Sequence, residues 1–126
     1  MFELTINDKV YQFNFGMGFL RDINKTLTTD IDGVKNAKKN IGLQFKLALL
    51  MDGDLETLVE VLDIANKGCE PRVKRTELDS YIDDSDTDID GLIAEVLDFL
   101  RQNNATKKTM ATLDEAIERE KAKQTA

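Results

Sequence analysis

The chain has 126 residues and a formal net charge of −7, with 41% hydrophobic and 33% charged residues. This length and composition predict one folded domain rather than a disordered chain. No hydrophobic run approaches the ~18 residues that a membrane span needs, and the first residues do not resemble a signal peptide. We therefore expect a cytoplasmic protein with no membrane partner. The chain has no histidine and a single cysteine, Cys69, which excludes an intramolecular disulfide and a Ser–His or Cys–His nucleophile pair.

The first 15 residues alternate hydrophobic and polar side chains and predict a β-hairpin. One face of the two strands is hydrophobic, with Phe2, Leu4 and Ile6 in the first strand and Tyr11, Phe13 and Phe15 in the second. Asn7 and Asp8 suit a two-residue turn because both tolerate positive φ. Such a turn places Leu4 opposite Tyr11, so the turn and the hydrophobic face predict the same register.

Hydrophobic residues at helical spacing predict five helices after the hairpin. In chain order they lie near residues 19–27, 41–51, 55–67, 76–82 and 89–100. The second is hydrophobic on nearly all sides, which is typical of a central, buried helix. The polar residues 28–40 predict a loop. Asp54 is expected to cap the third helix, and Thr76 with Asp79 to form the capping box of the fourth.

The chain ends with a polar stretch, 102–108, and an amphipathic segment whose hydrophobic stripe holds only Met110, Leu113 and Ile117. This stripe is marginal for an independent helix. Two interpretations stay open, because the segment could dock on the domain as a sixth helix or fold against a partner. We expect an α+β fold with an N-terminal β-hairpin packed on a mostly α-helical domain of five to six helices. Residues 1–101 would be globular, and residues 102–126 a linker with a C-terminal helix.

An acidic stretch from Asp86 matches a calcium-binding loop at its first, third, fifth and sixth positions. The twelfth position, which should supply a bidentate carboxylate, is Leu97. A loop there would also interrupt the helical stripe of residues 89–100. The simpler interpretation is an acid-rich helix N-terminus capped by Asp86 or Asp88. A calcium-binding regulatory module using the Asp86–Leu97 loop is the alternative function.

Charge is distributed unevenly along the chain. Residues 76–100 hold nine acidic residues and no Lys or Arg, a field that repels nucleic acid. A small basic cluster surrounds Pro71, formed by Lys67, Arg72, Lys74 and Arg75. It has no interleaved aromatic residues and is expected to be a solvated loop. No pair of carboxylates stands out for acid–base catalysis, so we expect no enzymatic activity, no cofactor and no metal site.

The order of these segments resembles the tail assembly chaperones of long-tailed, siphovirus-type phages and prophages of Gram-positive hosts. The resemblance runs from Met1 to about Lys121. It is carried by the opening FELTINDKVYQFNFGMGFLRDINK, by DGDLETLVEVLDIAN, by EPRVKRTELDSYIDD before an acidic helix, and by the closing NATKK.

The resemblance implies a non-enzymatic chaperone that binds the tape measure protein and recruits tail tube subunits during tail morphogenesis. Such a protein works in the host cytoplasm and is absent from the mature virion. On this basis we predict that Met110, Leu113 and Ile117 contact a partner. Self-association is left open, as is a minor virion component that assembles with itself. The resemblance also implies that a longer, frameshifted form can accompany a chain of this length.

Overall fold

The N-terminal hairpin forms in the predicted register. In the computed structural model, which describes residues 1–125, β1 (Phe2–Ile6) pairs antiparallel with β2 (Lys9–Phe13), and Leu4 lies opposite Tyr11. Asn7 and Asp8 adopt φ values of 51° and 65°, as a two-residue turn requires. The second strand is shorter than predicted. Phe15 lies beyond β2, yet its ring is buried between Phe2 and Phe19.

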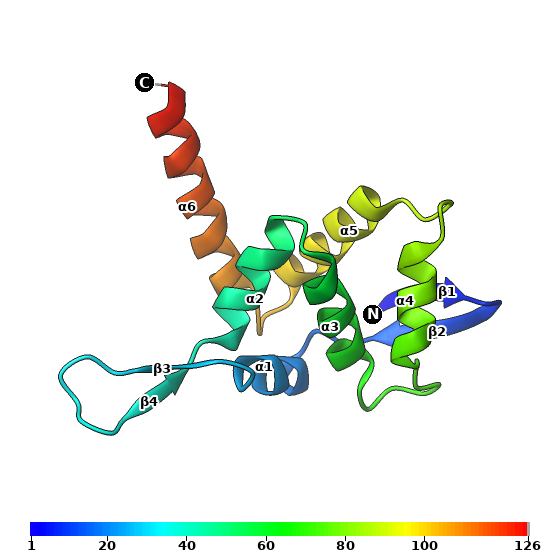
Figure 1. Cartoon of the computed structure of the whole chain (residues 1–126), viewed down its shortest axis with the longest axis horizontal. Coiled ribbons are helices and arrows are strands. Elements are labelled where there is room, and N and C mark those ends of the chain that lie inside the picture. Colours follow the sequence, from blue (N-terminus) through cyan, green and yellow to red (C-terminus); the bar gives the residue numbers. More distant parts are fainter. Residues whose placement is uncertain (126) are drawn as a thin grey trace.

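Six helices follow within the described residues, which confirms the α+β prediction. They are α1 (Met17–Asn24), α2 (Gly42–Met51), α3 (Leu55–Asn66), α4 (Arg75–Asp83), α5 (Ile89–Gln102) and α6 (Lys107–Thr125). Figure 1 shows the β1–β2 hairpin and α4 at one end of the long axis. None of the described helices has both the length and the hydrophobicity to cross a membrane.

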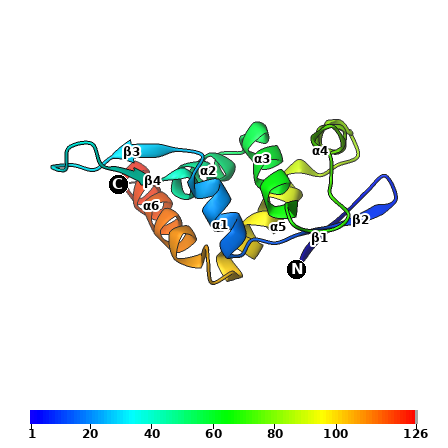
Figure 2. The same cartoon turned by 90° about the horizontal axis from the view of Figure 1, so that it is seen from below.

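A second hairpin replaces the predicted loop over residues 28–40. Here β3 (Thr28–Asp30) pairs antiparallel with β4 (Lys38–Asn40), and Asp30 forms a 2.8 Å ion pair with Lys38. The prediction was wrong because neither strand has a hydrophobic face to bury, so the alternating pattern that signals a strand is missing. This hairpin extends from the end of the molecule opposite to β1–β2 (Figure 2).

The helix α2 is central, as its composition predicted. It packs against α1, α3, α5 and α6, and its residues Leu47 and Leu50 are fully buried. The first residue of α2, Gly42, lies against α1, where a Cβ atom would collide with the carbonyl oxygen of Ile23. A glycine is therefore needed for the close approach of these two helices. Burial is not complete around α2, however, because Phe45 is 48% exposed.

Of the predicted caps of α3 and α4, the first is confirmed and the second is wrong. Asp54 caps α3 by accepting a 3.0 Å hydrogen bond from the Thr57 amide, as expected. In α4 the cap lies two residues earlier than predicted. Glu77 accepts a 3.0 Å hydrogen bond from the Lys74 amide, and Thr76 lies inside the first turn. The prediction was wrong because it placed the N-cap at Thr76, on the basis of its hydroxyl group. The carboxylate that accepts the hydrogen bond from the N-cap amide belongs to Glu77, three residues after Lys74.

The connection between α5 and α6 is a tight turn over residues 103–106. Thr106 is fully buried, and its hydroxyl donates a 2.6 Å hydrogen bond to the Leu100 carbonyl. Met110, in the first turn of α6 that follows, is also fully buried and belongs to the hydrophobic core. The base of α6 is thus docked on the domain. The division of the chain at residue 101 stays a prediction.

Candidate partner-binding surface

An apolar groove runs between α2 and α6. It consists of two adjoining pockets of about 400 and 250 Å³, both lined by Ala48 and Leu113. We call it the α2–α6 groove. Its apolar lining is formed by Ile41, Phe45, Ala48 and Met51 on the α2 side, and by Leu113, Ala116 and Ile117 on α6.

The groove exists because α2 has more hydrophobic surface than the domain covers. The inner side of the helix fills the core with Leu43, Leu47 and Leu50. The outer side carries Phe45, which is 48% exposed, and faces the stripe of α6, where Ile117 is 38% exposed. Contiguous exposed hydrophobic surface of this kind marks interaction sites in proteins. The residues common to both pockets are apolar, and this surface suits an apolar side chain or helix.

The structure separates the three residues of the predicted stripe. Leu113 and Ile117 line the α2–α6 groove. Met110 lies one turn earlier and is fully buried, so its side chain anchors α6 instead of facing the groove. Phe45 and Met51 were missed at the level of sequence. The available signal was the uniform hydrophobicity of α2, which does not tell which face is left uncovered.

An ion pair fixes α6 where it leaves the body. The guanidinium of Arg101, in α5, forms hydrogen bonds with both carboxylate oxygens of Asp114 and one with Asp98. The hydrogen bond from Arg101 holds the pKa of Asp114 below its ordinary value, and burial opposes this only in part. Beyond Asp114 the helix is exposed through residue 123, and it rises away from the other elements (Figure 1).

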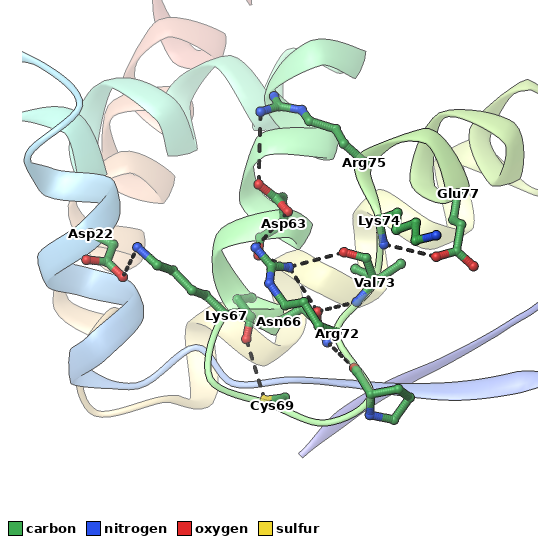
Figure 3. A network of polar contacts seen from close by, with 12 residues as sticks. Asp22, Asp63, Asn66, Lys67, Cys69, Arg72, Val73, Lys74, Arg75 and Glu77 are labelled. Carbon is green, nitrogen blue, oxygen red and sulfur yellow. Dashed lines mark hydrogen bonds and ion pairs between the residues drawn. The ribbon is translucent and has the colours of Figure 1, made fainter.

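The basic cluster around Pro71 is exposed but engaged in internal ion pairs (Figure 3). Lys67 pairs with Asp22 of α1 at 3.7 Å, and Arg72 and Arg75 pair with Asp63 of α3 at 3.0 and 4.0 Å. These pairs hold the loop after α3 against the helices. Three of the four basic residues of the cluster are therefore paired with acidic side chains of the chain itself, and their positions need no nucleic-acid ligand to explain them.

The centre of this network is Asn66, a fully buried residue that sequence reasoning missed. Its Nδ2 atom donates hydrogen bonds to the Gln12 carbonyl (2.9 Å) and the Pro71 carbonyl (3.2 Å). Its Oδ1 atom accepts from the Val73 amide (2.7 Å) and from Arg72 (2.9 Å). One side chain therefore joins β2, the end of α3 and the following loop. Its contacts with the loop are drawn in Figure 3.

The calcium-loop pattern is part of a helix. Asp88 caps α5, and its Oδ1 atom accepts a 3.1 Å hydrogen bond from the Gly91 amide. Residues 89–102 are helical, so the second half of the motif does not wrap around an ion site. This confirms the simpler interpretation of Asp88. Over residues 1–125, no group of three or more His, Cys, Asp or Glu side chains is arranged to hold a metal ion.

Comparison with known proteins gives one family. A family model described as phage tail assembly chaperone protein, TAC, matches residues 3–115. This range includes the whole α2 side of the α2–α6 groove and Leu113 on the other side. Searches of curated proteins and of solved structures give no match.

Proposed function

The chain belongs to the phage tail assembly chaperone family, and we propose that its α2–α6 groove binds a hydrophobic helical segment of the tape measure protein. We further propose that it recruits tail tube subunits to this complex and that it acts without catalysing a reaction. Its place of action would be the cytoplasm of a Gram-positive host of a siphovirus-type phage, and it would be absent from the mature virion.

The exposed hydrophobic surface of the α2–α6 groove is the observation that supports this proposal. A tape measure protein presents long apolar helical surface that must be shielded before the tube polymerises around it. A helix with hydrophobic residues at positions i, i+3, i+4 and i+7 fits an apolar groove between two helices. Phe45 of α2 and Ile117 of α6 would supply the contacts, together with Leu113, which lines both pockets.

The net charge of −7 suits such a role. A chaperone bound to an apolar chain must keep the complex dispersed, and like charges on neighbouring complexes oppose aggregation. The predicted contact residue Met110 takes a different part in this proposal. Because it is buried, it holds α6 in place and thereby positions Leu113 and Ile117.

The proposal is tested by co-expression with the tape measure protein of the same phage and measurement of the amount that co-purifies. The test variant is Phe45→Ser/Ile117→Ser, because both side chains are exposed and their replacement leaves the core intact. The matched control is Val10→Ser/Met17→Ser, which removes two hydrophobic side chains that are 50% and 51% exposed outside the groove.

We expect the groove variant to lower the affinity by roughly tenfold or more, as replacement of a central hydrophobic anchor does, while the control binds as the unaltered chain does. Equal binding by the groove variant and the unaltered chain would refute the proposed site. Circular dichroism of both variants verifies that the fold is retained.

A further inference from the structure

We propose that a second pocket, between α3 and α4, is a docking site for a hydrophobic side chain flanked by Lys or Arg on a partner protein. We call it the α3–α4 pocket. It has a volume of about 250 Å³ and is lined by Leu55, Glu56 and Val59 of α3 and by Asp79, Ile82 and Asp83 of α4.

The floor of the α3–α4 pocket is hydrophobic and accessible. Leu55 is the first residue of α3 and is 44% exposed. Val59, one turn later, is almost completely buried, and Ile82 of α4 is half-buried against the core. A pocket of this size accommodates one large aliphatic or aromatic side chain, which is how anchor residues of a partner engage a protein surface.

The rim of the pocket is acidic and lacks neutralising partners. Glu56, Asp79 and Asp83 are exposed, and none of them forms an ion pair or a side-chain hydrogen bond within residues 1–125. Residues 76–100 contain no Lys or Arg, so the part of α4 that follows Arg75 adds only acidic charges near the pocket. Three carboxylates around an apolar floor are complementary to a segment in which cations flank a hydrophobic residue, and they would attract it from solution.

The α3–α4 pocket shares no lining residue with the α2–α6 groove. Met51 and Asp52 line the groove, whereas Leu55 and Glu56 line the pocket, on the far side of the turn between α2 and α3. The two surfaces differ in chemistry, since the pocket has an all-acidic rim and the groove includes Lys121 beside Glu120. This inference therefore stands or falls separately from the proposed function.

The probe is a short amphipathic helical peptide of Leu and Lys, added to the full chain labelled with ¹⁵N. A Leu/Glu peptide with the same Leu positions is the matched control. We expect saturable amide shifts at Leu55, Glu56, Asp79, Ile82 and Asp83 with the Leu/Lys peptide, and no shifts at these residues with the Leu/Glu peptide. The absence of saturable shifts at these pocket residues would overturn the inference, whether or not the α2–α6 groove also responds.

Variants of the chain distinguish specific binding in the α3–α4 pocket from non-specific attraction by the negative charge of the chain. Asp79→Asn/Asp83→Asn removes two rim charges. It should lower the affinity for the Leu/Lys peptide about three- to tenfold, which is the effect of losing two exposed ion pairs. Asp90→Asn/Glu95→Gln removes the same charge from α5, outside the pocket. This variant should weaken binding of the Leu/Lys peptide less than about twofold. Equal weakening by both variants would mean non-specific attraction and would refute the site.

The hydrophobic floor is tested in the same way. Leu55→Ser should weaken binding by roughly tenfold because an exposed Leu that becomes buried in the complex contributes about 1–2 kcal/mol. Val10→Ser, which alters a similarly exposed residue on β2, should leave binding unchanged. An unchanged affinity of the Leu55→Ser variant would show that the pocket does not receive the peptide.

Discussion

Arg101 and Asp114 lie face to face across the α5–α6 junction, joined by two hydrogen bonds. They run from Nε to Oδ2 at 2.9 Å and from Nη2 to Oδ1 at 3.1 Å. This paired geometry is the most specific form of an arginine–carboxylate contact. It lies one residue after Leu113, so it fixes the wall of the α2–α6 groove at its junction with the body.

Breaking this pair should loosen α6 without unfolding the domain. Both side chains are more than a third exposed, so solvent screening limits the effect, and we expect Asp114→Asn to cost about 0.5–1 kcal/mol in free energy of unfolding. Since the pKa of Asp114 is lowered in the folded state, this contribution is complete above the ordinary carboxyl pKa of ~4 and is lost as the pH falls through the lowered value.

Urea unfolding of the two proteins at neutral and at acidic pH checks this. The difference in stability between the unaltered chain and Asp114→Asn should shrink below about pH 4. A difference that persists unchanged into strong acid would contradict the assigned role of the pair.

Replacement of Met110 should be far more costly than replacement of Ile117. Met110 is fully buried, so Met110→Ala leaves a cavity and should lower the free energy of unfolding by about 2–4 kcal/mol. Ile117 is 38% exposed, and Ile117→Ala should cost less than about 1 kcal/mol. Chemical denaturation measures both values. Similar costs for the two variants would mean that the base of α6 is not docked as described.

Asn66→Ala should be among the most destabilising single substitutions. It removes a buried side chain with four hydrogen bonds and leaves the Val73 amide and the Gln12 carbonyl without their partners. We expect a loss of about 2–4 kcal/mol. Asn104→Ala, at an exposed position in the α5–α6 turn, is the control and should stay within about 0.5 kcal/mol. An equally stable Asn66→Ala variant would argue against the network in Figure 3.

Asp88 should act as a helix cap and not as a calcium ligand. We expect Asp88→Ala to lower the free energy of unfolding by about 1 kcal/mol, to the same extent with and without Ca²⁺. Calorimetric titration of the unaltered chain with Ca²⁺ should give no saturable heat at micromolar concentrations. Saturable heat that disappears in Asp88→Ala would restore the calcium-binding alternative.

The hairpin and the helices were predictable because independent local signals agreed. The turn at Asn7 and Asp8 and the hydrophobic face of β1–β2 require one register, and a shift by one residue would expose that face. The β3–β4 hairpin lacks this second signal, because its strands are polar on both sides. A strand without a buried face cannot be recognised from its pattern.

Half of the α2–α6 groove could be predicted from the sequence. The stripe of α6 included Leu113 and Ile117, which line the groove, but also Met110, and its pattern did not tell which of the three is buried. The exposure of Phe45 depends on which neighbours α2 meets, and a uniformly hydrophobic helix carries no sign of that. The role of Asn66 could not be predicted for a related reason, because its partner Gln12 is 54 residues away in the sequence.

The burial of Met110 makes the consequences of proteolysis depend on position along α6. A cut after Arg119 would only shorten an exposed helix, and the folded body would keep all its core side chains. A cut after Lys107 or Lys108 would release the peptide that carries Met110 and open the interior to water. Limited digestion with trypsin should therefore trim the end of the chain readily, while the peptide bonds that precede Met110 stay intact as long as the domain is folded.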